Sequence, residues 1–115
     1  MQYVMLKSKI HKATVTGAEL DYEGSMTIDS DIMSMAGIRP HEKILVANLV
    51  NGERLETYAI PGEPGAKEFC LNGAAAHKGK TGDRVIIMSF CLVDESEISS
   101  HRPRMVILDE NNKPV

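Results

Sequence analysis

Short runs of apolar and β-branched residues, separated by turn residues, recur along most of the chain. The last long run, Arg84–Val93, is almost continuously apolar, which predicts a strand buried on both faces. Asn51-Gly52 predicts a two-residue hairpin loop, because both residues tolerate a positive φ. The pattern predicts strands over Lys9–Thr16, Ile44–Val50, Arg54–Ile60, Lys67–Leu71, Arg84–Val93 and Met105–Leu108.

One short segment carries a helical pattern instead. Asp29 or Ser30 can cap its start, apolar residues recur at helical spacing over Ile32–Ala36, and Gly37 ends it. Many short strands with one or two short helices predict an all-β fold, a small β-barrel. The polar tail after Leu108 is expected to be frayed.

Composition narrows the class of protein. A length of 115 residues predicts one domain, residues 1–115, around one core. Aromatic residues make up only 4% of the chain, so aliphatic and Met side chains must fill that core. The 13 basic and 16 acidic residues are spread along the chain, which argues against nucleic-acid binding. No apolar run approaches the roughly 20 residues of a membrane helix, and no signal peptide is recognised, so a cytoplasmic protein with reduced Cys70 and Cys91 is expected.

Conventional catalytic motifs are missing from the sequence. The four histidines are scattered without HxH or HxxxH spacing and there is no CxxC unit, so no metal site is expected. There is no GxSxG elbow and no phosphate-binding loop. An ordinary Ser-His hydrolase stays open on spacing alone, although no feature favours it.

The dipeptide Gly24-Ser25 has a special chemistry available to it. A Ser hydroxyl can attack the carbonyl of the preceding residue through a five-membered ring, which turns the amide into an ester. Gly lacks a Cβ, so its carbonyl can be held in an unusual conformation at low steric cost. Taken alone, however, a Gly-Ser dipeptide indicates a surface turn.

Several separated blocks place this dipeptide in a wider pattern. They are Met5-Leu6 with Lys9-Ile10-His11, Tyr22-Glu23-Gly24-Ser25, Asn51-Gly52-Glu53-Arg54, Thr57-Tyr58-Ala59-Ile60, Asn72-Gly73-Ala74-Ala75-Ala76-His77, and Gly82-Asp83 before Val85-Ile86-Ile87. In this order and spacing they resemble the aspartate 1-decarboxylase family, and together they span nearly the whole chain.

The resemblance implies a self-processing enzyme. Family members have a double-psi β-barrel fold and form homotetramers whose active sites are shared between subunits. The precursor is expected to cut itself between Gly24 and Ser25, leaving a 1–24 β-chain and a 25–115 α-chain. Ser25 becomes a covalent pyruvoyl group, so neither a metal nor PLP is expected. A processing or activating factor is left open as a further partner.

The resemblance also implies a reaction and roles for individual residues. The pyruvoyl group forms a Schiff base with L-aspartate and drives its decarboxylation to β-alanine for pantothenate and coenzyme A synthesis. Thr57 matches the family residue that stabilises the oxyanion during processing, and Tyr58 matches the proton donor. The expected substrate-binding residues are Arg54, Lys9, His11, Asn72, Gly73, Ala74 and Ala75.

Strand parity separates two of these roles. Along a strand, Arg54 and Tyr58 point to one face and Thr57 to the other. We therefore expect Thr57 to serve cleavage in its own subunit and Tyr58 to face another part of the site, across a subunit interface. The sequence leaves two alternatives to an aspartate decarboxylase. One is a pyruvoyl decarboxylase of another amino acid, and the other is an uncleaved β-barrel that acts as a binding or assembly module.

Overall fold

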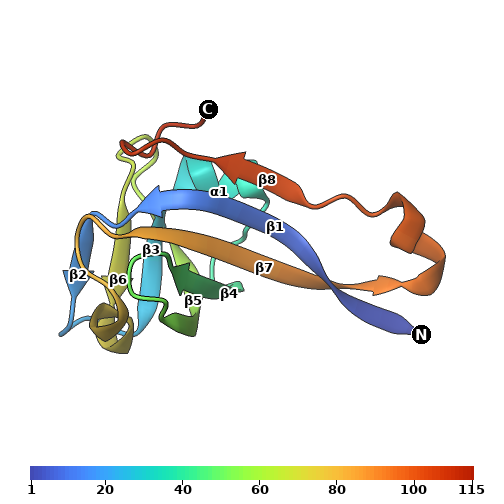
Figure 1. The fold of residues 1–115 in the computed structure, drawn as a ribbon, viewed down its shortest axis with the longest axis horizontal. Coiled ribbons are helices and arrows are strands. Elements are labelled where there is room, and N and C mark those ends of the chain that lie inside the picture. Colours follow the sequence, from blue (N-terminus) through green and yellow to red (C-terminus); the bar gives the residue numbers. More distant parts are fainter.

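The computed structural model describes all residues, 1–115, and it is mainly β, as the sequence predicted. Eight strands form one sheet in the order β2-β6-β3-β5-β4-β7-β1-β8, which curls into a barrel-like body (Figure 1). The strands are β1 (Gln2–Thr14), β2 (Gly17–Glu19), β3 (Ser25–Asp29), β4 (Lys43–Asn48), β5 (Arg54–Gly62), β6 (Phe69–Asn72), β7 (Arg84–Asp94) and β8 (Arg104–Ile107).

The core is one continuous cluster of buried side chains drawn mainly from the strands and the helix α1 (Ser30–Ala36). Aliphatic and Met side chains dominate it, and Phe69 is its one aromatic member. Packing of this kind follows from a sequence that holds only 4% aromatic residues.

The predicted helix is confirmed as α1, with both of its predicted ends. The carboxylate of Asp29 accepts a hydrogen bond from the backbone N–H of Asp31 at 2.8 Å. Gly37 ends the helix in the left-handed region, with φ +70°. Two 3-10 helices, η1 (Gly73–Lys78) and η2 (Glu95–Ser100), complete the set of three short helices, one more than the sequence suggested at most.

The connection between β4 and β5 is longer than predicted. The two strands do form an antiparallel hairpin, but β4 ends at Asn48 and β5 begins at Arg54, so the two-residue loop was wrong. The side chain of Asn48 accepts a hydrogen bond from the backbone N–H of Val50 at 2.8 Å, which starts a turn earlier than the hydrophobic pattern implied. Within this loop only Gly52 has a positive φ, +76°.

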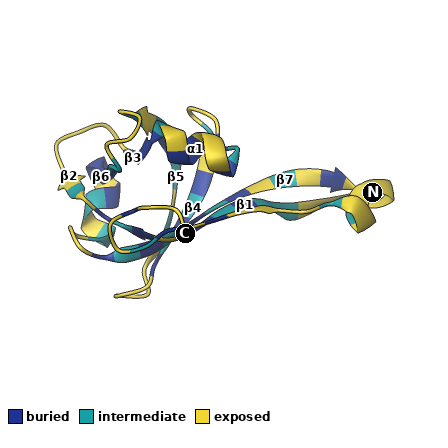
Figure 2. Ribbon diagram, turned by 90° about the horizontal axis from the view of Figure 1, so that it is seen from above, coloured by how far each residue is buried: buried dark blue, intermediate teal, exposed yellow.

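Strand β7 is buried on one face rather than on both, which corrects a second prediction. Its burial alternates along the strand, and Phe90 and Leu92 are exposed. The far ends of β1 and β7 run together as a two-stranded arm that extends beyond the body (Figure 1), and Figure 2 shows exposed residues along it. The apolar outward side chains of this arm therefore meet solvent in the single chain.

The C-terminal tail is ordered by contacts with the body, not frayed as expected. Asn112 is 2% exposed and its side chain bonds both the N–H and the carbonyl of Thr14, at 2.7 and 2.9 Å. Leu108 and Pro114 form an isolated antiparallel bridge. A buried, hydrogen-bonded amide side chain thus holds a segment whose polar composition indicated disorder.

Candidate active site

Ser25 is the first residue of β3 and is almost completely buried, with 1% of its surface exposed. Its hydroxyl lies 3.3 Å from the carbonyl oxygen of Glu23, to which it donates a hydrogen bond. The Oγ of Ser25 also accepts a hydrogen bond from the Nδ2 of Asn72, at 3.0 Å. Ser25 is thus a buried, oriented hydroxyl, unlike the surface turn that a Gly-Ser dipeptide alone suggests.

Asn72 holds this hydroxyl from the neighbouring strand. It is 2% exposed, ends β6, and is the register partner of Ser25 in the antiparallel β3–β6 pair. Its amide nitrogen also donates to the Oγ1 of Thr27 at 2.9 Å, and its carbonyl oxygen accepts from the thiol of Cys70 at 3.3 Å. Burial raises the pKa of Cys70, and the charges of Glu68 and Glu19 add to the rise, so this thiol stays protonated and able to donate.

Gly73 packs directly against the backbone of the segment before Ser25. A Cβ on Gly73 would lie 2.8 Å from both the Cα and the N of Gly24 and 2.8 Å from the carbonyl oxygen of Tyr22. Its φ of +65° also favours glycine. Only glycine therefore allows η1 to begin this close to Gly24.

A cavity of about 410 Å³ opens beside Gly24. Strand β5 and helix η1 supply most of its border. The bordering residues are Gly24, Leu55, Glu56, Thr57, Tyr58, Ala74, Ala75 and Lys78. The structure thus gathers five of the predicted site residues, Gly24, Thr57, Tyr58, Ala74 and Ala75, around one space. Ser25 follows Gly24 directly, and the side chain of Asn72 contacts Ser25.

Thr57 and Tyr58 both reach this cavity, although neighbouring residues of a strand point to opposite faces. The β4–β5 pairing runs without a register shift from Lys43 opposite Tyr58 to Ala47 opposite Arg54, so no bulge upsets the alternation. The ring of Tyr58 is tilted by 36° against that of His41, with 6.1 Å between the ring centroids. Strand parity is therefore regular here, and both residues nevertheless border the same cavity.

Five of the seven predicted substrate-binding residues do not border the cavity: Asn72 and Gly73, which precede Ala74 in the chain, and Lys9, His11 and Arg54. Lys9 and His11 are in β1, where they pair with Met105 and Ile107 of β8. Arg54 is exposed at the start of β5. In the single chain the expected carboxylate-binding cations are thus not on the border of the cavity beside Gly24.

His11 has a distinctive environment in β1. Its Nδ1 is buried without a hydrogen-bond partner. Burial lowers the pKa of His11, and the positive charges of Lys9, Lys12 and Arg84 lower it further. The imidazole therefore stays neutral at a pH where a free histidine begins to protonate.

Sequence reasoning missed three residues that border the cavity: Leu55, Glu56 and Lys78. Leu55 and Glu56 lie between Arg54 and Thr57, so their place on the same strand was an available signal. Lys78 carries no such signal, because only the course of η1 brings its side chain to the cavity. No group of three or more His, Cys, Asp or Glu side chains is placed to hold a metal ion, and no helix is long and apolar enough to cross a membrane.

Comparison with known proteins finds relatives that match the full length of the chain. The sequence model of the family described as aspartate decarboxylase matches residues 1–115. The chain is 50% identical over 115 residues to the aspartate 1-decarboxylase of Thermoanaerobacter pseudethanolicus, covering all of this chain and 98% of that protein. It is 54% identical over 115 residues to the enzyme of the same name from Syntrophobacter fumaroxidans, covering all of this chain and 93% of the relative. It is 56% identical over 112 residues to that of Clostridium kluyveri, covering 97% of this chain and 88% of the relative. Because the family model and two of these relatives match its whole length, the chain belongs to the aspartate decarboxylase family.

Proposed function

We propose that this member of the aspartate decarboxylase family cuts itself between Gly24 and Ser25 and then converts L-aspartate to β-alanine and carbon dioxide, for pantothenate synthesis. The observation that carries the proposal is the buried hydroxyl of Ser25, held by Asn72 at 3.0 Å directly after a glycine that borders a cavity. A structural serine at the start of a strand needs neither the cavity nor the close approach of Gly73.

The cleavage uses the chain's own groups. The Oγ of Ser25 attacks the carbonyl carbon of Gly24, the C–N bond breaks, and the proton of the hydroxyl passes to the freed amine, leaving an ester. Negative charge gathers on the Gly24 oxygen during the attack, and Thr57, on the border of the same cavity, is the proposed donor to it.

The ester then loses Gly24 as a carboxylate when a proton leaves the Cα of residue 25, which gives dehydroalanine. One water molecule hydrolyses the tautomeric imine, releasing ammonia and leaving a ketone. The products are a 1–24 chain and a 25–115 chain that begins with a pyruvoyl group.

The residues around Ser25 fit this group. The amide of Asn72 donates to the Oγ of Ser25, the oxygen that would leave with Gly24 as the group forms, and η1 begins against the backbone of Gly24. When formed, the pyruvoyl ketone supplies the electron sink that takes up the electron pair released on decarboxylation. Tyr58 is the proposed proton donor to the carbon that was the Cα of the aspartate substrate. Ala74 and Ala75 line the space for that substrate.

The one cation on the border of this cavity, Lys78, is paired with Glu53, so the substrate's carboxylates need other cations. We propose that Arg54 and Lys9, with His11 beside Lys9, act in a site shared between subunits of a homotetramer. Support comes from the exposure of Arg54 outside the cavity and from a second hollow of about 400 Å³ bordered by residues of β1, β4, β5 and β7, including Val4 and Phe90. Exposed apolar surface of this kind favours an interface.

Intact-mass measurement with a carbonyl-reactive probe tests the proposal. A 1–24 fragment and a 25–115 fragment with a reactive ketone are expected, together with β-alanine production. Ser25→Ala should stay uncut and inactive, and Tyr58→Phe should be cut but turn over poorly. A chain that remains whole after long incubation would instead favour the binding module, and turnover of glutamate in preference to aspartate would favour the other decarboxylase.

A further inference from the structure

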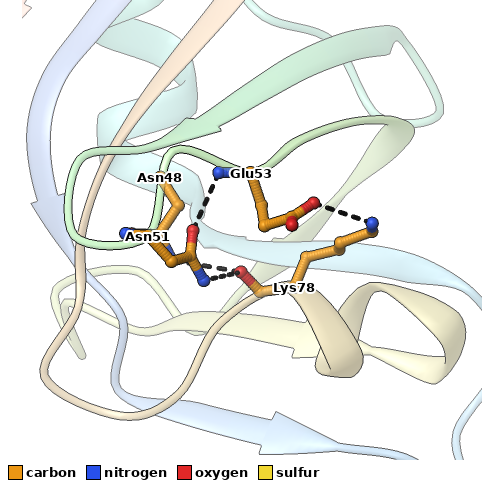
Figure 3. Close-up of polar contacts among 4 residues, drawn as sticks. All are labelled: Asn48, Asn51, Glu53 and Lys78. Carbon is orange, nitrogen blue, oxygen red and sulfur yellow. Dashed lines mark hydrogen bonds and ion pairs between the residues drawn. The ribbon is translucent and has the colours of Figure 1, made fainter.

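The loop between β4 and β5 is tied to the last residue of η1 by a set of polar contacts, which we call the Asn51 clamp (Asn48, Asn51, Glu53 and Lys78; Figure 3). The carbonyl oxygen of Lys78 accepts two hydrogen bonds, from the Nδ2 of Asn51 at 3.0 Å and from the Nδ2 of Asn48 at 3.1 Å. The ammonium of Lys78 forms an ion pair with Glu53 at 2.8 Å. Segments far apart in the sequence are therefore joined at one point.

Asn51 is the residue that connects the two sides. Its Oδ1 accepts a hydrogen bond from the N–H of Glu53 at 2.9 Å, which fixes the side chain to its own loop. Its Nδ2 reaches the carbonyl of Lys78, 27 residues away. An amide is the side-chain group that can accept on one side and donate on the other, as this position requires.

The clamp bears on the cavity because both segments that it joins form the border. Leu55 to Tyr58 of β5 follow the loop directly, and Ala74, Ala75 and Lys78 belong to η1. At its other end η1 begins with Gly73, against the backbone of Gly24. A shift of η1 would therefore move the groups around Gly24 relative to Thr57 and Tyr58.

The two kinds of contact in the clamp have different weights. The Lys78 and Glu53 side chains are 42% and 48% exposed, and exposed ion pairs contribute little. The Lys78 carbonyl is held by two amide donors that are each fixed by a further bond: Asn51 by Glu53, and Asn48 by Asp83 at 2.9 Å. The amides rather than the ion pair should hold η1 in place.

We infer that Asn51 is a positioning residue, which holds η1 against β5 so that the backbone around Gly24 and the side chains of Thr57 and Tyr58 keep their relative places. This inference rests on the proposed function, because its effect is measured on self-cleavage and turnover.

The test compares two nearly isosteric changes. Asn51→Asp keeps the acceptor for the Glu53 N–H, so the loop keeps its conformation. It turns an oxygen instead of an N–H toward the Lys78 carbonyl, so the hydrogen bond between residue 51 and Lys78 (the Asn51 bridge) is lost. Glu53→Gln removes the ion pair and keeps the bridge. We expect Asn51→Asp to slow cleavage by roughly three- to tenfold, the weight of one hydrogen bond with Asn48 still in place, and Glu53→Gln to leave it within about twofold.

The readouts separate positioning from simple loss of stability. Cleavage rates are followed by intact mass at a temperature well below the melting point of every variant, and kcat and KM are measured on fully cut protein. We expect kcat to fall with the cleavage rate while KM changes by less than about twofold. Equal rates for Asn51→Asp and the unaltered chain would overturn the inference alone, whereas an unaltered chain that never cuts would overturn the proposed function as well.

Discussion

The side-chain amide of Asn72 donates to the hydroxyl oxygen of Ser25 at 3.0 Å, and the two residues are also register partners between β6 and β3. The backbone pairing sets the distance, and the side-chain contact sets the direction of the hydroxyl. A strand pair thus orients the atom that we propose as the nucleophile.

Replacing Asn72 with alanine should slow self-cleavage. Loss of the Nδ2 donor frees the Ser25 hydroxyl to adopt other rotamers, and a reduction of roughly tenfold is expected from one buried hydrogen bond. Thr27→Val is the control, because it removes only the second acceptor of the same amide. The time course of the 1–24 fragment by mass spectrometry gives both rates. Cleavage of Asn72→Ala at the unaltered rate would contradict this role.

Gly73→Ala should impair both stability and cleavage. The new Cβ would meet the Gly24 backbone at 2.8 Å, in addition to the strain of a positive φ. Gly65→Ala is a matched control, since its φ is +84° and nothing lies within 4 Å of an added Cβ. It should lose about 1 kcal/mol of stability and cut normally. The melting point and the cleavage rate are measured for both variants under the same conditions. Equal cleavage rates in the two variants would contradict the steric role of Gly73.

Asp29 should make stability depend on pH in the acid range. Its burial alone would raise its pKa, but the N–H groups of Lys67, Asp31 and Gly65 outweigh burial and hold the pKa below its ordinary value. The folded state therefore binds this proton less readily than the unfolded state. The stabilisation is fully present above the ordinary carboxyl pKa, about 4, and is lost as the pH falls through the lowered value.

Asp29→Asn should accordingly reduce the free energy of unfolding near pH 7 by about 2–3 kcal/mol and flatten its decline below about pH 4. Urea unfolding at a series of pH values measures both effects. Asp94→Asn, at the exposed end of β7, should change stability by less than about 0.5 kcal/mol. If the free energy of unfolding of Asp29→Asn declined with falling pH as steeply as that of the unaltered chain, other carboxyl groups would be responsible for the decline.

Phe90→Asp should weaken subunit association without unfolding the chain. Phe90 is 44% exposed and borders the second hollow beside β4, so an aspartate there would place a charge in the proposed interface. Light scattering after size exclusion should show a smaller species. Met35→Asp, at a similarly exposed apolar residue of α1, should keep the size of the unaltered protein. A tetrameric Phe90→Asp would place the interface elsewhere.

Local signals predicted those parts of the fold that local contacts determine. Helix α1 followed from the Asp29 cap and the Gly37 stop because both act within one helical turn. The two-residue loop at Asn51-Gly52 was wrong because the Asn48 side chain bonds the loop backbone, which no hydrophobic pattern reveals. The burial of β7 was overestimated because its apolar run continues onto an arm that the single chain leaves uncovered.

In the candidate site, too, some residues were predictable from the sequence, whereas the contacts between distant segments were not. Resemblance to a family named Gly24, Thr57, Tyr58, Ala74 and Ala75, and all five meet at one cavity. The Asn72 contact with Ser25 spans 47 residues and depends on strand register, so no spacing rule could give it. Lys78 reaches the cavity only through the path of η1, and its backbone carbonyl, not its charge, receives the Asn51 bridge.

The pairing of β1 with β7 and β8, and of β2 with β6, has a consequence for what happens after a cut at Gly24. The two strands of the 1–24 piece, β1 and β2, would remain hydrogen-bonded in the sheet without a covalent link to the 25–115 chain. Unfolding of the cut protein would release the 1–24 piece as a second peptide, so the melting point of the cut protein should depend more steeply on concentration than that of the uncut protein. Refolding would require two separate peptides to find each other, so unfolding of the cut protein is harder to reverse than that of the uncut chain.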